Sequence, residues 1–285
     1  MLRKSINFLI TEFVLNGHMQ SLGAVGIVCV SYYFFFSSSV FRLDLILISY
    51  LLFECVYIFD RFVDINHDFL TNFRRSSHIK KYFNYVPIIL FVMLLLLFSL
   101  LFIYANMISV FTVAVIVGFG FLYPIFFKKL TKRIPLFKNF YVSSVFALMV
   151  FLPAIYFENY AFDLIELVVF FTCVFFEAFI GQIVLDMKDL ESDKRRQILT
   201  LPVMVGMKKS LFIVNLLSLL NLLVFTFLFL YLNFVLGIYL LLVISFMVNY
   251  LSVVMVKKNQ KSAYLAQAGK FFVWFLGYLI VNMIV

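Results

Sequence analysis

One stretch of the sequence decides the fold class: residues 164–196 read LIELVVFFTCVFFEAFIGQIVLDMKDLESDKRR. Its first part is almost continuously apolar, and about 20 apolar residues in a helix span the ~30 Å hydrocarbon layer of a membrane. Its end carries regularly spaced aspartates, followed by a run of basic residues. The stretch therefore predicts a membrane-spanning helix whose end bears an acidic motif where water can reach it.

Similar apolar runs recur along the whole chain. Hydrophobic residues make up 65% of the 285 residues and charged residues only 13%, and the mean hydropathy is +1.09. A soluble domain cannot accommodate that much apolar surface, because its exterior must meet water. We expect spans near residues 18–37, 43–66, 83–104, 107–128, 139–158, 162–186, 210–230, 234–256 and 264–285. The prediction is an all-α polytopic membrane protein, a bundle of about nine transmembrane helices.

No linker or low-complexity segment interrupts these runs, so we expect one domain over residues 1–285. Residues 1–17 are expected to lie on the membrane surface as an interfacial N-terminal segment.

The formal charge of +9 is explained by topology rather than by nucleic acid. Lysines and arginines cluster near residues 74–81, 128–138, 188–209 and 257–261, whereas the loops near 105, 158–163 and 231–234 contain none. Such an asymmetry places basic loops in the cytoplasm; Arg42 is an isolated exception. We expect a multi-pass protein of an inner cell membrane, with its acidic motifs facing the cytoplasm and with no protein partner.

Two acidic motifs lie at the predicted cytoplasmic ends of the second and sixth spans. Their members are Asp60, Asp64 and Asp68 in the first motif and Asp186, Asp189 and Asp193 in the second. The spacings i, i+4, i+8 and i, i+3, i+7 each place three carboxylates on one face of a helix. The repeat of the motif four spans later would arise if the chain consists of two halves of about four helices. Each half would then place its aspartates at the same face of the membrane.

Carboxylates one turn apart repel each other unless a positive species lies between them. One such species is Mg²⁺, a hard cation that is commonly held by one or two carboxylates together with substrate phosphates. The alternative is pairing with Arg61, Lys188 or the basic residues that follow each motif. If Mg²⁺ is present, basic side chains would neutralise the remaining oxygens of a bridged diphosphate.

These parts suit the ionisation of an allylic diphosphate. A metal ion stabilises the charge that develops on the departing diphosphate. The remaining carbocation would react with water, and a helical cavity inside a membrane excludes water while accommodating an isoprenoid tail.

Three stretches resemble the UbiA family of intramembrane prenyltransferases. DMKDLESDKRRQILTLPVMVG, at 186–206, resembles the family's DxxDxxxD followed by TLPV and glycine. YPIFFKKLTKRIPLFKN, at 123–139, resembles its Tyr-Pro and lysine loop. The first acidic motif resembles NDxxDxxxD in part: Val56 and Tyr57 stand where Asn and Asp are usual, and Asp68 supplies a carboxylate one turn later. In the second motif, Gln197 stands where Gly is usual.

The resemblance implies Mg²⁺ as cofactor and transfer of an isoprenyl group, within membrane lipid, from an isoprenyl diphosphate to a lipophilic or aromatic acceptor. The implied catalytic residues are Asp60, Asp64, Asp186, Asp189 and Tyr123. Of these, Tyr123 would face the allylic cation. The implied metal ligands are Asp60, Asp64, Asp68, Asp186, Asp189 and Asp193. The implied diphosphate contacts are Arg74, Lys128 and Lys194.

Two other functions use the same features. A terpene cyclase would need the same ionisation without an acceptor, and a non-catalytic membrane protein would use the acids to bind cations. Two glutamates also lie at membrane depth, where ionisable side chains are costly. We expect Glu177 to point away from Asp186, and Glu54 either to pair with Arg61 or to orient an acceptor.

Overall fold

The computed structural model describes residue 8 and residues 11–14, 16–36, 42–71, 73–160, 163–234, 236–260 and 262–284, with side chains for all of these except 36, 67–71 and 281–284. Much of the predicted interfacial segment, namely residues 1–7, 9, 10 and 15, lies outside the described residues.

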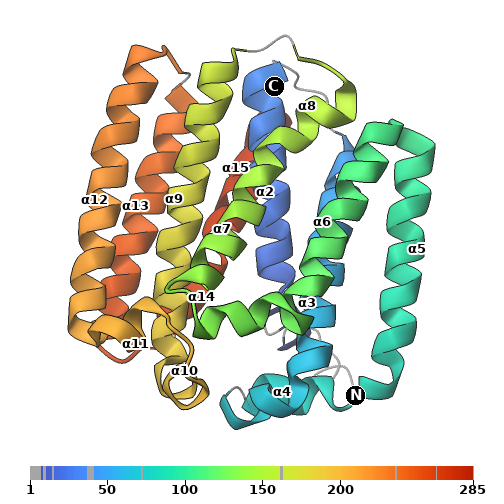
Figure 1. Ribbon diagram of the computed structural model, residues 1–285. Helices are drawn as coiled ribbons and strands as arrows, with labels where there is room; N and C mark the ends of the chain where they lie inside the picture. Colours follow the sequence, from blue (N-terminus) through green and yellow to red (C-terminus); the bar gives the residue numbers. More distant parts are fainter. Residues whose placement is uncertain are drawn as a thin grey trace.

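The described residues form long helices joined by short turns and short helices (Figure 1). The long helices are α2 (His18–Phe36), α3 (Leu43–Thr71), α5 (Val86–Tyr104), α6 (Met107–Ile125), α7 (Phe137–Leu148), α9 (Leu164–Lys188), α12 (Met207–Tyr231), α13 (Leu236–Lys257) and α15 (Lys270–Ile284). The short ones are α4 (Phe73–Ile79), η1 (Phe83–Tyr85), η2 (Phe127–Lys132), η3 (Met149–Phe151), α8 (Leu152–Phe157), α10 (Leu190–Arg196), α11 (Leu201–Val205) and α14 (Ser262–Ala268).

The predicted all-α membrane class is confirmed. Among the described residues, six helical segments are long and apolar enough to cross a membrane, and α14 with α15 makes a seventh if the pair, bent by 51°, is one span. The predicted runs at 18–37 and 43–66 correspond to α2 and α3, which have 19 and 29 residues. Because α3 carries several charged residues, composition alone does not identify it as a span. The count of nine therefore stays a prediction.

Helix α2 lies at the centre of the bundle, with α5 and α12 at opposite edges (Figure 1). Its strongest partner is α15, and Gly26 explains how closely the two helices approach. A Cβ at this position would lie 2.3 Å from the backbone oxygen of Phe271 and 2.8 Å from the backbone nitrogen of Phe275. Small residues allow such backbone contact, which favours helix association inside a membrane.

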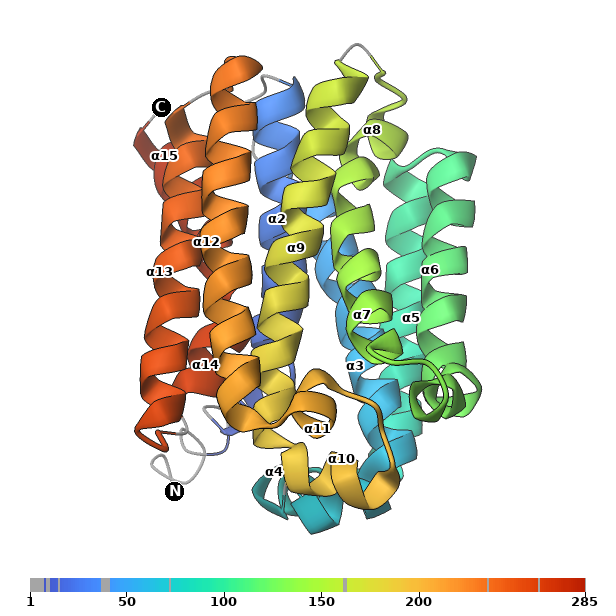
Figure 2. The same ribbon diagram turned by 60° about the vertical axis from the view of Figure 1, so that its left-hand side comes forward.

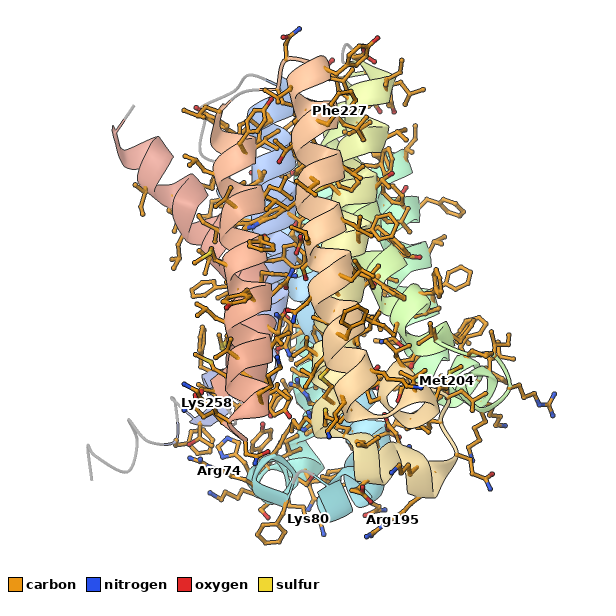
Figure 3. The ribbon with its side chains drawn as sticks, turned by 90° about the vertical axis from the view of Figure 1, so that its left-hand side faces the viewer. Arg74, Lys80, Arg195, Met204, Phe227 and Lys258 are labelled. Carbon is orange, nitrogen blue, oxygen red and sulfur yellow. The ribbon has the colours of Figure 1, made fainter. Side chains whose placement is uncertain are left out.

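The outer helices present large apolar side chains to the surroundings. Phe91 on α5 and Phe111 on α6 are more than half exposed, as is Phe227 on α12, which points away from the bundle in Figure 3. Exposed apolar surface of this extent marks a face that meets lipid rather than water. Charged side chains gather instead at one end of the bundle, where Figure 3 shows Arg74, Lys80, Arg195 and Lys258.

A buried ion pair between Glu177 and Lys270 links α9 to later helices of the chain. Lys270 and Glu177 are each 1% exposed, and the Lys270 Nζ donates to Glu177 Oε2 at 2.8 Å and to the Glu177 backbone oxygen at 2.7 Å. Asn221 on α12 donates to Glu177 Oε1 at 2.6 Å, and Asn249 on α13 donates to Oε2 at 3.0 Å. Glu177 thus points away from the acidic motif and links α9 to α12, α13 and α15.

We predict that Lys270→Met destabilises the bundle by about 3–5 kcal/mol, because it leaves the Glu177 carboxylate buried and unpaired. The double variant Lys270→Met with Glu177→Gln should recover part of this loss. Unfolding of the purified protein in mixed detergent micelles measures both, with Lys258→Met, at an exposed lysine, as the control. Equal stability of Lys270→Met and the control would contradict the role given to the ion pair.

Candidate active site

A polar cavity of about 260 Å³ lies where α3, η2, α9 and α10 meet. Figure 2 shows α10 below the end of α9, at the same end of the bundle as the last turns of α3. Four of the six motif aspartates line the cavity: Asp60, Asp64, Asp189 and Asp193. Six basic side chains line it as well: Arg61, Arg75, Lys128, Lys138, Lys188 and Arg196. Aspartates of the two motifs, at least 125 positions apart in sequence, are thus brought to one site.

The second acidic motif does not lie on one continuous helix. Helix α9 ends at Lys188, Asp189 occupies the turn, and α10 begins at Leu190. The break turns Asp189 and Asp193 towards the cavity and leaves Asp186 behind them in the packed interior. Gln197, with φ of 57°, then ends α10 in the left-handed region, the conformation in which a helix commonly ends on glycine.

Asp186 is fully buried and serves as a link between helices. Its Oδ1 accepts a hydrogen bond from Lys138 Nζ at 2.6 Å, and its Oδ2 accepts one from Asn139 Nδ2 at 2.7 Å. Both donors belong to the first turn of α7, so the contact fixes α7 against α9 beside the cavity. Lys138 also lines the cavity, and Asp186 therefore orients this lysine towards it.

The other carboxylates differ in how far the protein satisfies them. Asp64 is in contact with Lys128 Nζ. Asp60 has a buried Oδ1 that receives no hydrogen bond from the part of the chain that the structure describes. Burial raises the pKa of Asp193 to about 6; Lys138 opposes that rise, and the charges of Asp186 and Asp189 add to it. Asp64 is thus already paired, whereas Asp60 keeps an oxygen available to a cation. The side chain of Asp68, also predicted as a metal ligand, lies outside the described residues.

The residues fit a cation that is shared with a ligand. Among the described residues no group of three His, Cys, Asp or Glu side chains is placed to hold a metal alone. Two carboxylates from each motif nevertheless face one cavity, and Asp60 offers a free oxygen. This donor set suits Mg²⁺, which keeps waters and completes its shell with phosphate oxygens.

The predicted basic contacts divide into two groups. Lys128 lines the cavity, whereas Arg74 and Lys194 are exposed and outside its lining; Lys194 is 3.9 Å from Glu191 on the same helix. Their sequence neighbours Arg75 and Arg196 line the cavity instead. Adjacent residues on a helix point in directions about 100° apart, so a basic run in the sequence does not reveal which member faces inward.

Arg61 is a residue of the cavity that the sequence analysis named only as a possible ion-pair partner. It lines the cavity, it is only 6% exposed, and its Nη1 has no hydrogen-bond partner among the described residues. The guanidinium lies 5.5 Å from the centre of the Tyr57 ring and against Gly17, where a Cβ would lie 2.7 Å from Nη2. Glu54, its expected partner, contacts Ser21 and His18 instead. A buried guanidinium without an ion pair is costly unless an anion joins it.

A second cavity, of about 110 Å³, adjoins the polar one and is mostly apolar. Helices α3, α6 and α7 line it with Leu52, Phe53, Val56, Tyr57, Asp60, Ile116, Gly120, Tyr123, Tyr141, Val142, Val145 and Phe146. Tyr57, Asp60, Tyr123 and Val142 line both cavities. Tyr123, the residue expected to face the allylic cation, therefore stands at the junction, where its ring stacks on Tyr141 with centroids 4.8 Å apart.

Solved structures of similar fold cover almost the whole chain. A UbiA homologue from Aeropyrum pernix K1 matches with a TM-score of 0.69 at 15% identity, over 94% of this chain and 98% of its own. A UbiA homologue from Archaeoglobus fulgidus, bound to DMAPP and Mg²⁺, matches with a TM-score of 0.69 at 13% identity, over 96% and 99%. Digeranylgeranylglyceryl phosphate synthase matches with a TM-score of 0.55 at 19% identity, over 98% of both chains. These similarities establish the fold.

A search of curated protein sequences finds no match. The family model described as the UbiA prenyltransferase family, in contrast, matches residues 21–276, and so covers the helices that form both cavities. The chain belongs to the UbiA prenyltransferase family.

Proposed function

We propose that the protein transfers an isoprenyl group from an isoprenyl diphosphate to a lipophilic or aromatic acceptor within the membrane, with Mg²⁺ as cofactor. One observation carries the proposal: a cavity lined by carboxylates and cations adjoins an apolar cavity, and Asp60 and Tyr123 line both. The diphosphate and its tail need these two environments side by side. The Archaeoglobus homologue binds a diphosphate of this class together with Mg²⁺, which supports the assignment.

Asp60, Asp64, Asp189 and Asp193 would hold Mg²⁺ together with the diphosphate oxygens. When bound, the metal neutralises the negative charge that builds up on the leaving diphosphate. Asp186 lies outside the cavity lining and would act through Lys138, which it orients. Five basic side chains that line the cavity would neutralise the remaining charge of the diphosphate: Arg61, Arg75, Lys128, Lys138 and Arg196.

In the reaction, the bond between the first carbon of the isoprenyl group and the diphosphate oxygen breaks, and its electron pair leaves with the diphosphate. A bond then forms between that carbon and the acceptor, which loses a proton. Tyr57 and Tyr123 line both cavities, so their rings would lie near the carbon that is released, and aromatic rings attract positive charge. The apolar walls beyond them exclude water, which would otherwise capture the cation.

We predict that Asp60→Asn and Asp189→Asn each lower turnover by at least about 100-fold, since even the outer partners of metal ligands contribute 10–100-fold. Purified protein would receive a labelled isoprenyl diphosphate and a lipid extract as the source of acceptor, with prenylated lipid as the readout. Chelation of Mg²⁺ should abolish it. Asp163→Asn, at the exposed cap of α9, is the control, because asparagine caps a helix equally well.

The same assay separates the competing functions. Full turnover in both aspartate variants would contradict the metal assignment. Release of a hydrocarbon product without any extract would indicate a terpene cyclase, and metal binding without diphosphate binding would indicate a cation-binding protein.

We predict opposite effects of Arg61→Met on binding and on stability. Affinity for the Mg²⁺-diphosphate donor should fall by about 10- to 100-fold, the contribution of hydrogen bonds to a charged group. Resistance of the unliganded protein to unfolding should rise, because the variant removes a buried, unpaired charge. Titration with the donor and thermal unfolding measure the two effects, and Arg74→Met, at the exposed neighbour of Arg75, should change neither. Unchanged donor affinity would show that Arg61 is not part of the site.

A further inference from the structure

We propose that a third cavity, between α2, α9 and the bent pair α14 and α15, binds an uncharged hydroxyl group of the acceptor through glutamine side chains. The inference rests on the proposed function, because it takes the protein to be a transferase that needs an acceptor. It goes further by naming the site of the acceptor and the chemical group that this site recognises.

The third cavity adjoins both cavities of the candidate active site. It shares Gln20, Gln182 and Leu185 with the polar cavity, and it shares Phe146 with the apolar cavity. It measures about 30 Å³, which is room for at least a hydroxyl group or a water molecule. An acceptor must meet the carbon that joins the donor's tail to its diphosphate, so a site that adjoins the places of both is suited to hold it.

The charges that line the third cavity already balance each other. Glu177 and Lys270 both line it and form the buried ion pair described above. The three hydrogens of the Lys270 ammonium have three acceptors: the Glu177 backbone oxygen, Glu177 Oε2 and, at 3.1 Å, Asn249 Oδ1. No donor of this lysine is left for a carboxylate or a phosphate, and an added anion would lie beside Glu177 in a place where charge is costly. The cavity therefore favours an uncharged group.

Gln267 supplies a hydrogen-bond acceptor that the protein does not satisfy. The side chain lines the cavity and is 5% exposed, and its Nε2 donates to Asn249 Oδ1 at 3.0 Å. Its Oε1 receives no hydrogen bond from the described residues, and a buried amide oxygen without a donor is costly. A hydroxyl group can donate to this oxygen and accept from the amide of Gln20 or Gln182, whereas a ketone, an ether or an ester can only accept. The unsatisfied group thus selects a hydroxyl.

Gly181 leaves space next to the oxygen of Gln267. This glycine of α9 also lines the cavity. A Cβ at its position would lie 3.2 Å from Gln267 Oε1 and 3.7 Å from Lys270 Nζ. The methyl group of an alanine would therefore occupy the place that a hydrogen-bond donor needs. Gly181→Ala is for this reason a small and local change that blocks the proposed site.

The first test identifies the group on the acceptor. The full chain in lipid nanodiscs receives Mg²⁺, labelled dimethylallyl, geranyl and farnesyl diphosphate, and one lipid extract in three forms. One form is untreated, one is acetylated at its hydroxyl groups, and in one the carboxylic acids are converted to neutral amides with a carbodiimide and methylamine. Acetylation should reduce the formation of prenylated lipid at least about 100-fold, because a site built for a hydroxyl rejects a compound without it. Amidation should leave it unchanged.

Two controls narrow the result. Mild alkaline removal of the acetyl esters should restore the product, whereas acetylated amines would stay blocked. The ultraviolet absorbance of the product then distinguishes a phenol from an aliphatic alcohol as the source of the hydroxyl.

Variants connect this group with the third cavity. Gly181→Ala should raise the apparent KM for the extract about tenfold, the effect of adding a methyl group to a filled site. Gln267→Met keeps the size of the side chain but removes the amide oxygen, and should raise the same KM by about three- to tenfold. The affinity for dimethylallyl diphosphate, measured by titration, should stay unchanged in both. Gly277→Ala on α15, where a Cβ would have no atom within 4 Å, is the matched control and should alter neither quantity.

The outcomes distinguish this inference from the proposed function. Full turnover with the acetylated extract, or loss of turnover on amidation, would overturn the assignment of the hydroxyl group alone. An unchanged KM for the extract in folded Gly181→Ala and Gln267→Met would overturn the acceptor site and leave the space beside Gln267 to a water molecule. Failure of all three isoprenyl diphosphates to bind would overturn the proposed function as well.

Discussion

Repulsion between carboxylates is the constraint around which this end of the bundle is arranged. Asp60, Asp64, Asp189 and Asp193 face one small cavity from two directions, and partial burial weakens the screening that would separate their charges. The protein answers with cations of its own at some oxygens and leaves others open. Among the described residues, Asp60 Oδ1 and Arg61 Nη1 have no hydrogen-bond partner. The cavity therefore offers one group to a cation and one to an anion, as the proposed metal-bound diphosphate requires.

Lys128 neutralises Asp64 within the site, whereas two other internal ion pairs fix helices to one another. Lys138 holds Asp186 and so fastens α7 to α9, while Lys270 holds Glu177 and fastens α9 to α15. Both carboxylates are buried, although they point to different sides of α9. The outer helices need no such contacts, because apolar side chains can meet the membrane directly. Helix α9 is therefore the common support of the site and of the core.

Much of the fold could be predicted from the sequence, because long apolar runs leave a helix in a membrane few alternatives. The details of the site could not. The i, i+3, i+7 spacing of the second motif assumes an unbroken helix, and only the turn at Asp189 separates the cavity-lining acids from Asp186. Arg61 stood between two aspartates and looked like their partner, yet its burial against Gly17 and Tyr57 depends on the chain before α2. Choosing Arg75 over Arg74 requires the rotation of α4, which no local pattern gives.

The ion pair between Glu177 and Lys270 also bears on how the protein is made. The two residues are 93 positions apart in sequence, and the ribosome completes α9 well before α15. While the chain is being synthesised, Glu177 enters the membrane before Lys270 has been made. Its carboxylate therefore lacks this partner at a depth where an unpaired charge is costly. The bundle can therefore lock into its final arrangement only after α15 has entered the membrane.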